Sequence, residues 1–293
     1  MLSDNVKSRP RFQVISSMSR AFLIWGVLVL SGRAFAADPD PRALVSAVVR
    51  NEIVAARDDH TLWRQVTIQD TTEGEKSYEE VQTTGGHIRR LCAINGRPLN
   101  DEQRAKEDRR IAELLNAPGA QRKLLADEQK DAERAREMFQ MFPEAFDYQY
   151  AGDERGITKL TFTPNPEFDP PSREGQVLHA LGGTMWVDAE QKRLVRVEGH
   201  LVSEVKFGWG LLGHLDPGGT FLVEQREVGP GHWEITKLDV RMKGKALLFK
   251  SINVQQREIR SHFQRVEDST SLAKGAELLR QQPQSIVAGI SGR

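Results

Sequence analysis

The sequence has few of the residues that build covalent or metal-bound frameworks. Cys92 is the only cysteine in 293 residues, which excludes an internal disulfide and any site built from several cysteines. The seven histidines are scattered, and the His-Glu-x-x-His pattern of zinc enzymes is missing. No apolar run reaches the roughly 20 residues that a membrane-spanning helix needs. We therefore expect no cofactor, no metal site and no membrane span after signal cleavage.

Catalytic and nucleotide-binding motifs are also missing. Gly208–Gly213 satisfies the pattern Gly-x-Gly-x-x-Gly, but the residues after it cannot begin the helix that a dinucleotide site requires. A nucleophile elbow and a Walker loop are absent. A hydrolase would have to bring Glu198 and His200 together with the loop 208–219, and no motif supports that arrangement. We assign no catalytic residue.

Net charge gives the chain no general affinity for polyanions. The 41 basic residues equal the 41 acidic residues, so no field attracts nucleic acid or anionic lipid. Removing residues 1–36 takes away five basic residues and one acidic residue, which leaves a mildly acidic chain of 36 basic and 40 acidic residues. We expect no nucleic-acid partner.

The first 36 residues read as a signal peptide. Ala21–Leu30 is a short apolar run preceded by Arg20, and Ala34–Ala36 is a small-x-small cleavage signal. The start is Met1 or Met18, because Met18 to Ala36 alone makes a compact signal peptide. These features predict export, with the mature protein in the periplasm or secreted.

The remaining chain reads as one sheet domain, 37–266, interrupted by helices. Asp40-Pro41 begins a helix that runs to about Arg57. The highly charged insertion 100–142 predicts two helices, 100–116 and 120–141. We expect the polar tail 267–293, which includes a short helix near Leu272–Leu279, to be loosely held and flexible.

Alternating polar and apolar residues predict strands in the rest of the domain. In the central stretch Val195, Val197 and Leu201 alternate with polar neighbours, as a half-buried strand requires. Turn signals separate most of these runs. Strands are expected at residues 62–68, 77–83, 87–94, 145–151, 157–163, 177–188, 194–207, 221–228, 232–242 and 246–266. The prediction is an α+β fold: a curved, half-barrel-like antiparallel meander with an N-terminal helix and a helical insertion covering one face.

The central strands resemble those of a known family. Gly183–Asp188 (Gly-Thr-Met-Trp-Val-Asp), followed by Leu194–Gly199 (Leu-Val-Arg-Val-Glu-Gly) and the closing arm 244–266, resembles the bacterial lipoprotein-carrier family, the LolA/LolB-type fold and its lipoprotein-sorting relatives. The resemblance covers mainly residues 184–266 and the order of elements. It implies a curved sheet whose concave apolar face is covered by helices and holds acyl chains in several members.

These observations lead to two hypotheses. The first is an exported binding protein for a hydrophobic or amphiphilic ligand, a lipid or acyl chain, with lipoprotein carriage as one form of that function. The candidate ligand-binding residues are Trp186, Val195, Val197, Leu201, Phe221, Val223, Phe139 and Phe142. The alternative is an exported protein–protein interaction or sensor domain that binds an envelope protein and no small ligand. In the first hypothesis the insertion docks on the sheet along an apolar stripe that includes Leu125, Ala132 and Met138.

Overall fold

The computed structural model describes residues 40–208, 212–246 and 250–281. The predicted signal peptide, with both candidate start sites, lies outside the described residues. Among the residues that are described, no helix is long and apolar enough to cross a membrane.

The helices fall into an N-terminal one, an inserted group and a C-terminal one. α1 begins after Asp40, whose carboxylate accepts the backbone N–H of Arg42, and proline occupies its first turn, as predicted. Asn100 and Gln103 form a capping box at the start of α2. The helices are α1 (Pro41–Asp58), α2 (Asp101–Leu115), α3 (Pro118–Gln140), α4 (Phe142–Ala145), α5 (Arg173–Leu178) and α6 (Leu272–Gln281).

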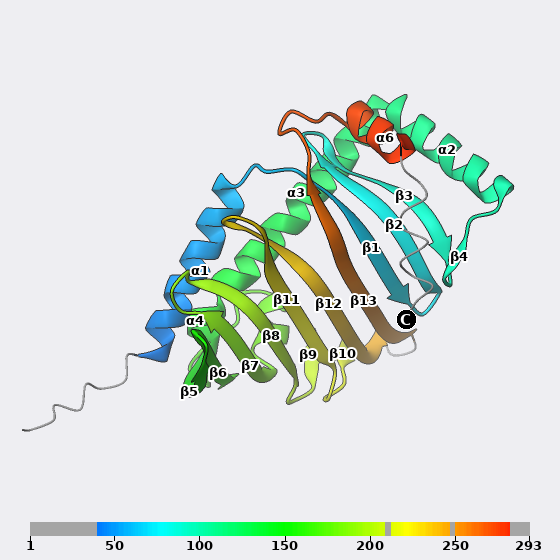
Figure 1. Cartoon of the computed structure of the whole chain (residues 1–293). Coiled ribbons are helices and arrows are strands. Elements are labelled where there is room, and N and C mark those ends of the chain that lie inside the picture. The colour runs from blue at the N-terminus through cyan, green and yellow to red at the C-terminus, as the bar shows by residue number, and fades with distance from the viewer. Residues whose placement is uncertain (1–39, 209–211, 247–249, 282–293) are drawn as a thin grey trace, which may run out of the picture. The chain divides into compact units, whose positions relative to one another are not determined.

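All the strands belong to one antiparallel sheet. They are β1 (Trp63–Thr71), β2 (Gly74–Thr83), β3 (Gly86–Ile94), β4 (Arg97–Pro98), β5 (Phe146–Glu154), β6 (Ile157–Pro164), β7 (Leu181–Asp188), β8 (Arg193–Leu201), β9 (Val205–Phe207), β10 (Gly213–Leu215), β11 (Thr220–Gly229), β12 (His232–Ala246) and β13 (Lys250–Arg265). The main order is β4-β3-β2-β1-β13-β12-β11-β8-β7-β6-β5, so the first hairpins join the rest through the pairing of β1 with β13. The sheet is strongly curved and does not close into a barrel, which confirms the predicted fold class (Figure 1).

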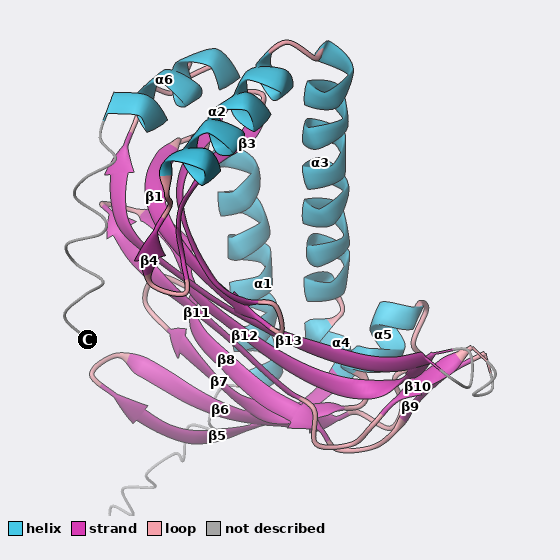
Figure 2. Cartoon of the chain, turned by 90° about the vertical axis from the view of Figure 1, so that its right-hand side faces the viewer, coloured by secondary structure: helices cyan, strands magenta, loops and turns pink. Residues whose placement is uncertain are grey.

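Helices α1 and α3 lie on one face of the sheet, inside its curve (Figure 2). We call this the concave face and the opposite one the convex face. The strand register assigns residues to these faces, because directly opposed residues point the same way. Met185, Val197, Val223 and Leu238 form one such row on the concave face.

A row of two glycines and two phenylalanines marks the bend on the concave face. Phe162 pairs with Gly183, Gly183 with Gly199, and Gly199 with Phe221. A Cβ on Gly199 would lie 2.5 Å from the carbonyl oxygen of Gly182 and 2.8 Å from the Phe221 ring. The backbones of β7 and β8 therefore approach too closely for side chains, and the flanking rings cover the gap. Such glycine kinks are a recognised way to curve a sheet.

Two hydrophobic cores hold the helices to the sheet. The larger core joins Val45, Val48 and Val49 of α1 to Phe142 and to concave side chains of β5–β8. The smaller core joins Val81 and Ile88 of β2 and β3 to α2 and α6. By register Val81 lies on the convex face, so the two cores occupy opposite faces at opposite ends of the sheet.

The structure differs from the sequence-based prediction in several places. Val177 belongs to α5 and not to a strand, and β7 begins only at Leu181. The predicted strand 194–207 is interrupted, since β8 ends at Leu201 and β9 begins at Val205. The break predicted between the strands 232–242 and 246–266 is wrong, because β12 continues to Ala246 and Gly244 pairs with both Leu215 and Ile252. In the segment 267–293, α6 is not a loose element, since its side chains Leu272, Ala276 and Leu279 are buried against β2 and β3.

Beyond its short pairing with β4, strand β3 has an outer side whose backbone groups bind helix side chains. Glu128 accepts the backbone N–H of His87 at 3.0 Å, and Glu107 accepts that of Leu91 at 2.9 Å. Between them Arg110 donates to the carbonyl oxygen of Arg89 at 2.6 Å. These helix residues satisfy the groups that an exposed edge strand would offer to another chain.

The Gly183–Gly199 contact can be tested by substitution. Gly183→Ala should destabilise the fold by about 1–3 kcal/mol or more, because its methyl group would overlap the carbonyl oxygen of Glu198. Gly119→Ala is the matched control: no atom lies within 4 Å of its Cβ position, and alanine in α3 should stabilise by about 0.5–1 kcal/mol. Urea denaturation of both variants measures the difference. Equal stabilities would show that the close approach does not constrain the fold.

Candidate functional site

The structure separates the residues predicted to bind an apolar ligand. Trp186 lies on the convex face, where Lys159 and Arg196 stack on its ring with centroid distances of 5.4 and 5.2 Å. Val197 and Leu201 lie on the concave face but are only 4% and 1% exposed, within the larger core. Trp186 therefore cannot share a surface with the other two.

Val195 lies at a β-bulge that the sequence pattern did not reveal. The register between β7 and β8 shifts between Trp186 and Val187, so that Leu194 takes the core position in place of Val195. Glu52 of α1 accepts the backbone N–H of Leu194 at 2.8 Å and holds Arg193 in an ion pair at 3.1 Å. Burial raises the pKa of Glu52, partly offset by the charge of Arg193.

The four remaining predicted residues border the larger core. Phe142 is buried in it, while Phe139, Phe221 and Val223 are partly exposed and pack against it. Phe139 and Phe142 touch, with ring centroids 5.0 Å apart. These four residues line the margin of the core on the concave face, next to a surface that the sequence pattern missed.

That surface consists of apolar residues on the central strands. Leu238, Val240, Ile252 and Val254, which we call the apolar floor, lie on the concave face by register. None of them belongs to either core, and Val254 is 42% exposed. Within the described residues, no side chain of β11, β12 or β13 is fully buried. The longest strands of the sheet thus carry apolar side chains that the protein covers only in part.

Helix α3 crosses this face without packing on it. It passes diagonally behind the central strands in Figure 1 and stands apart from them in Figure 2. All ten residues from 129 to 138, which we call the strap, are exposed, and Met138 is 39% exposed. A helix exposed on every side over ten residues has no face against protein. The predicted docking of Ala132 and Met138 on the sheet is therefore wrong.

The strap is fixed only at its two ends. At the start of α3, Leu124 packs on the smaller core, and at its end Phe139 packs on the larger core. Between these points the side chains are Glu, Asp, Lys, Arg, Gln and Ala apart from Leu125 and Met138. Such residues are rarely buried without partners, which explains why the middle of α3 stays in water.

Glu128 provides a polar attachment beside Leu124. Its carboxylate accepts the His87 backbone N–H at 3.0 and 3.1 Å and lies 3.0 Å from the ring nitrogen Nδ1. Gly86 has a φ of 100°, and a Cβ there would lie 2.9 Å from Glu128 Oε2. Burial alone would lower the pKa of His87, but the hydrogen bond and charge of Glu128, together with Glu80, raise it above its ordinary value.

The concave face becomes polar next to the apolar floor. Along β13 the concave residues Val254, Gln256, Glu258 and Arg260 change from apolar to charged, and Glu258 binds Arg260 at 2.6 Å. Beyond them Gln82 of β2 donates to Glu234 of β12 at 3.5 Å, although β1 and β13 separate these strands. The sheet is therefore curved enough here for distant strands to meet across its concave face.

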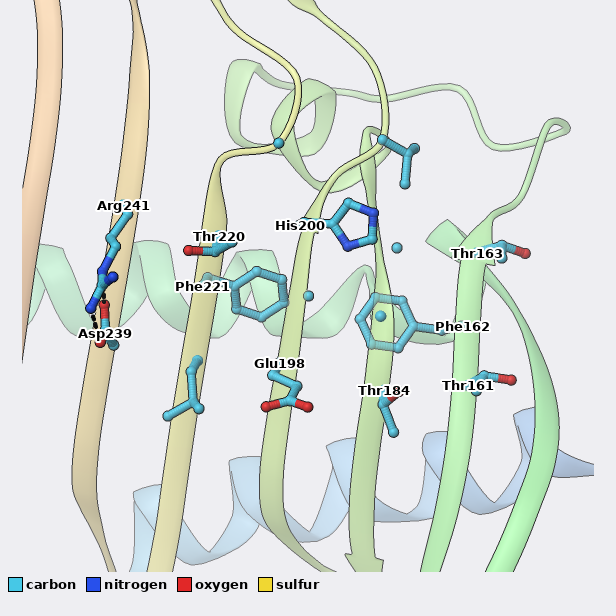
Figure 3. Close-up of a pocket in the computed structure, with 16 residues that line it drawn as sticks. Thr161, Phe162, Thr163, Thr184, Glu198, His200, Thr220, Phe221, Asp239 and Arg241 are labelled. Carbon is cyan, nitrogen blue, oxygen red and sulfur yellow. Dashed lines mark hydrogen bonds and ion pairs between the residues drawn. The ribbon is translucent and has the colours of Figure 1, made fainter.

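The convex face carries an open trough of about 870 Å³ across β6, β7, β8, β11 and β12 (Figure 3). Thr161, Thr184, Thr220 and His200 line it, together with backbone exposed by glycines. Its charges are paired within the protein, Glu198 with Arg196 and Asp239 with Arg241 at 3.1 Å. Glu198 and His200 thus lie in a polar surface depression. In the described part of the chain, no three His, Cys, Asp or Glu side chains form a group suited to a metal ion.

Comparison with known proteins gives distant structural likenesses. No protein-family model and no curated protein matches the chain. A DUF1329 family protein from Desulfovibrio piger is similar at 11% identity over 83% of this chain and 100% of that chain, with a TM-score of 0.27. MucB, solved in complex with MucA(peri), is similar at 10% identity over 80% of this chain and 97% of that chain, with a TM-score of 0.21. Scores this low carry no argument about function.

The attachment of α3 at His87 should depend on pH. Because the folded pKa of His87 is raised, its stabilising contribution is complete below about 6.5 and is lost as the pH rises through the folded value. The pair is partly exposed, so the change should stay below about 1 kcal/mol. Protection factors from hydrogen exchange of residues 121–130 should therefore fall by a few-fold between pH 5.5 and 8.

Two variants separate the imidazole from the carboxylate. His87→Gln keeps the backbone bond to Glu128 and should abolish the pH dependence, whereas Glu128→Ala should lower protection at every pH. The other charged groups near His87 are Glu80, Arg260 and Glu234. If the pH dependence survives in His87→Gln, one of these groups and not the imidazole controls the attachment.

Proposed function

We propose that this protein is an exported binding protein that holds a hydrophobic or amphiphilic ligand between the strap and the apolar floor. One observation carries the proposal: partly exposed apolar side chains on the central strands lie on the face that the strap crosses without packing on it. The predicted signal peptide supports export to the periplasm or the exterior. The resemblance of the central strands to the lipoprotein-carrier family is consistent with an acyl chain as part of the ligand.

Energetics favour an apolar ligand at this place. Burial of apolar surface contributes roughly 25 cal/mol per Å², so an alkyl chain on Leu238, Val240 and Val254 would bind without a specialised residue. The strap is attached at both ends, so a ligand beneath it is enclosed without refolding of the sheet. Phe221, Val223 and Phe139 form the margin of this proposed site, and Phe142, buried in the larger core, packs behind Phe139.

A matched pair of variants on β13 tests the proposal. Val254→Glu places a charge on the concave face at an exposed position, and Asn253→Glu places the same charge one residue away on the convex face. Val254→Glu should weaken binding of the neutral fluorescent probe N-phenyl-1-naphthylamine by about tenfold, because the ligand would have to desolvate a carboxylate. Asn253→Glu should leave it unchanged.

Circular dichroism and thermal melting establish that both variants are folded. Native mass spectrometry of the purified wild-type protein then identifies any lipid that remains bound. Failure of the wild type to bind the probe, or equal affinities in the two variants, would overturn the proposal.

Binding of an envelope protein without a small ligand is the second candidate. The convex trough favours it, since threonine hydroxyls and charges paired within the protein suit a polypeptide surface better than an alkyl chain. Photo-crosslinking in cells from residue 184, on the convex face, should then capture a defined protein, and residue 254 should capture none. Crosslinks to lipid from residue 254 alone would contradict this second candidate.

A further inference from the structure

The concave face beside the apolar floor carries two carboxylates without ion pairs. Glu80 accepts a hydrogen bond from Thr67 at 3.1 Å, and Glu234 has only the long bond from Gln82. Among the described residues, no Lys, Arg or His nitrogen lies within 4.0 Å of either carboxylate. The neighbouring charges are already paired, Glu258 with Arg260 and Glu128 with His87. Arg89 lies opposite Glu80 in the pairing of β2 with β3, and the charge of Arg260 acts on Glu234. Four carboxylates, Glu80, Glu234, Glu258 and Glu128, thus stand against Arg89, Arg260 and His87, which leaves an excess of negative charge at this end.

Both carboxylates belong to the same electrostatic environment. Glu80 raises the pKa of His87, and His87 in turn lowers that of Glu234, so the three groups lie within range of one another. Burial is the largest influence on Glu234 and raises its pKa above the ordinary value. Arg260 and His87 offset this only in part. A partly buried carboxylate without a close ion pair costs stability, which the fold would avoid if the position had no other role.

Gln65 adds an unsatisfied acceptor at the same place. It lies directly opposite Glu80 in the pairing of β1 with β2, so both side chains belong to the concave face. Gln65 is 1% exposed, and its Oε1 atom has no hydrogen-bond partner among the described residues. Two carboxylates and an amide oxygen are all acceptors, which suit a positively charged group with N–H donors.

We infer that the amphiphilic ligand carries a cationic head, an ammonium or guanidinium group, that binds between Glu80 and Glu234 while its apolar chain lies on the floor. This inference rests on the proposed function and specifies the chemistry of its ligand. Arg260 connects the floor to both carboxylates. It follows Glu258, which lies opposite Leu238, on the same face of β13; it lies opposite Thr67, the donor to Glu80; and its charge acts on Glu234. An anionic head would be repelled by the excess of carboxylates, and a neutral head would leave that excess without a counter-ion.

A series of amphiphiles with one chain length tests the head group separately from the chain. The probes are decylammonium, decyltrimethylammonium, decyl maltoside and decyl sulfate, measured below their micellar concentrations by displacement of N-phenyl-1-naphthylamine. Decylammonium should bind at least about tenfold more tightly than decyl sulfate. It should also exceed decyltrimethylammonium, which has the charge but no N–H donors for Gln65.

Variants assign the preference to the two carboxylates. Glu80→Gln and Glu234→Gln should each weaken decylammonium binding several-fold, and together by roughly tenfold or more, while decyl maltoside binding stays constant. Asp239→Asn is the matched control, because it removes a carboxylate from the convex face. Glu234→Gln should also raise the melting temperature at pH 7 and not at pH 4, where the wild-type carboxyl is protonated; this confirms that the variant folds.

The outcomes distinguish the two proposals. Equal affinity of the wild type for all four probes, or an unchanged preference in the double variant, overturns the cationic head and leaves the apolar site intact. Failure of every probe, decyl maltoside included, overturns the apolar site itself.

Discussion

The close approach of β7 and β8 at Gly183 and Gly199 is the constraint on which the rest of the structure depends. Two backbones that leave no room for a Cβ bend the sheet, and Phe162 and Phe221 cover the bend from the concave side. The bend gives the open sheet a concave face. Helix α1 covers one end of this face with its valine stripe, and side chains from β2 and β12 meet across the other end. The central strands between these ends are left with a curved apolar surface.

Composition then decides what covers that surface. α1 has a stripe of valines and packs, whereas the middle of α3 has only Ala132, Ala135 and Met138 among its charged and polar residues and remains in water. A charged helix can still be held near an apolar surface if its two ends are attached, as Leu124 and Phe139 attach this one. The same division appears in the polar groups: helix side chains bind three backbone groups along β3, while Glu80 and Glu234 on the concave face have no ion pair and Gln65 Oε1 has no partner among the described residues.

The sequence predicted the elements much better than the site. Period-two patterns and turn residues located nearly every strand, and Asp40-Pro41 located α1, because these signals are local. The face of the sheet on which each side chain lies was harder to predict. One bulge at Val195 reverses the alternation of inward and outward side chains on β8. The sequence pattern also predicts Trp186 as a ligand-binding residue, whereas the strand register places it on the convex face beside cations. The apolar residues of the floor are evident in the sequence of β12 and β13. The alternation of polar and apolar residues is the same, however, in a strand that a helix covers and in one that no helix covers. Only the path of α3, which depends on the two distant attachments, distinguishes them.

The helix at Leu272–Gln281 was recognised as a helix, but its packing on β2 depends on contacts far along the chain.

The pairing of β1 with β13 has a consequence for how the protein is made. These two strands come from opposite ends of the described chain, and β1 is paired on only one side until Arg265 has been synthesised. Throughout that interval β1 presents a row of unpaired N–H and C=O groups, the template that promotes association between chains. Distant pairings are also the slow ones to form. A nascent chain of this protein therefore has to be kept extended or shielded until its last strand is available, and a chain truncated before β13 would lack the seam that joins the two halves of its sheet.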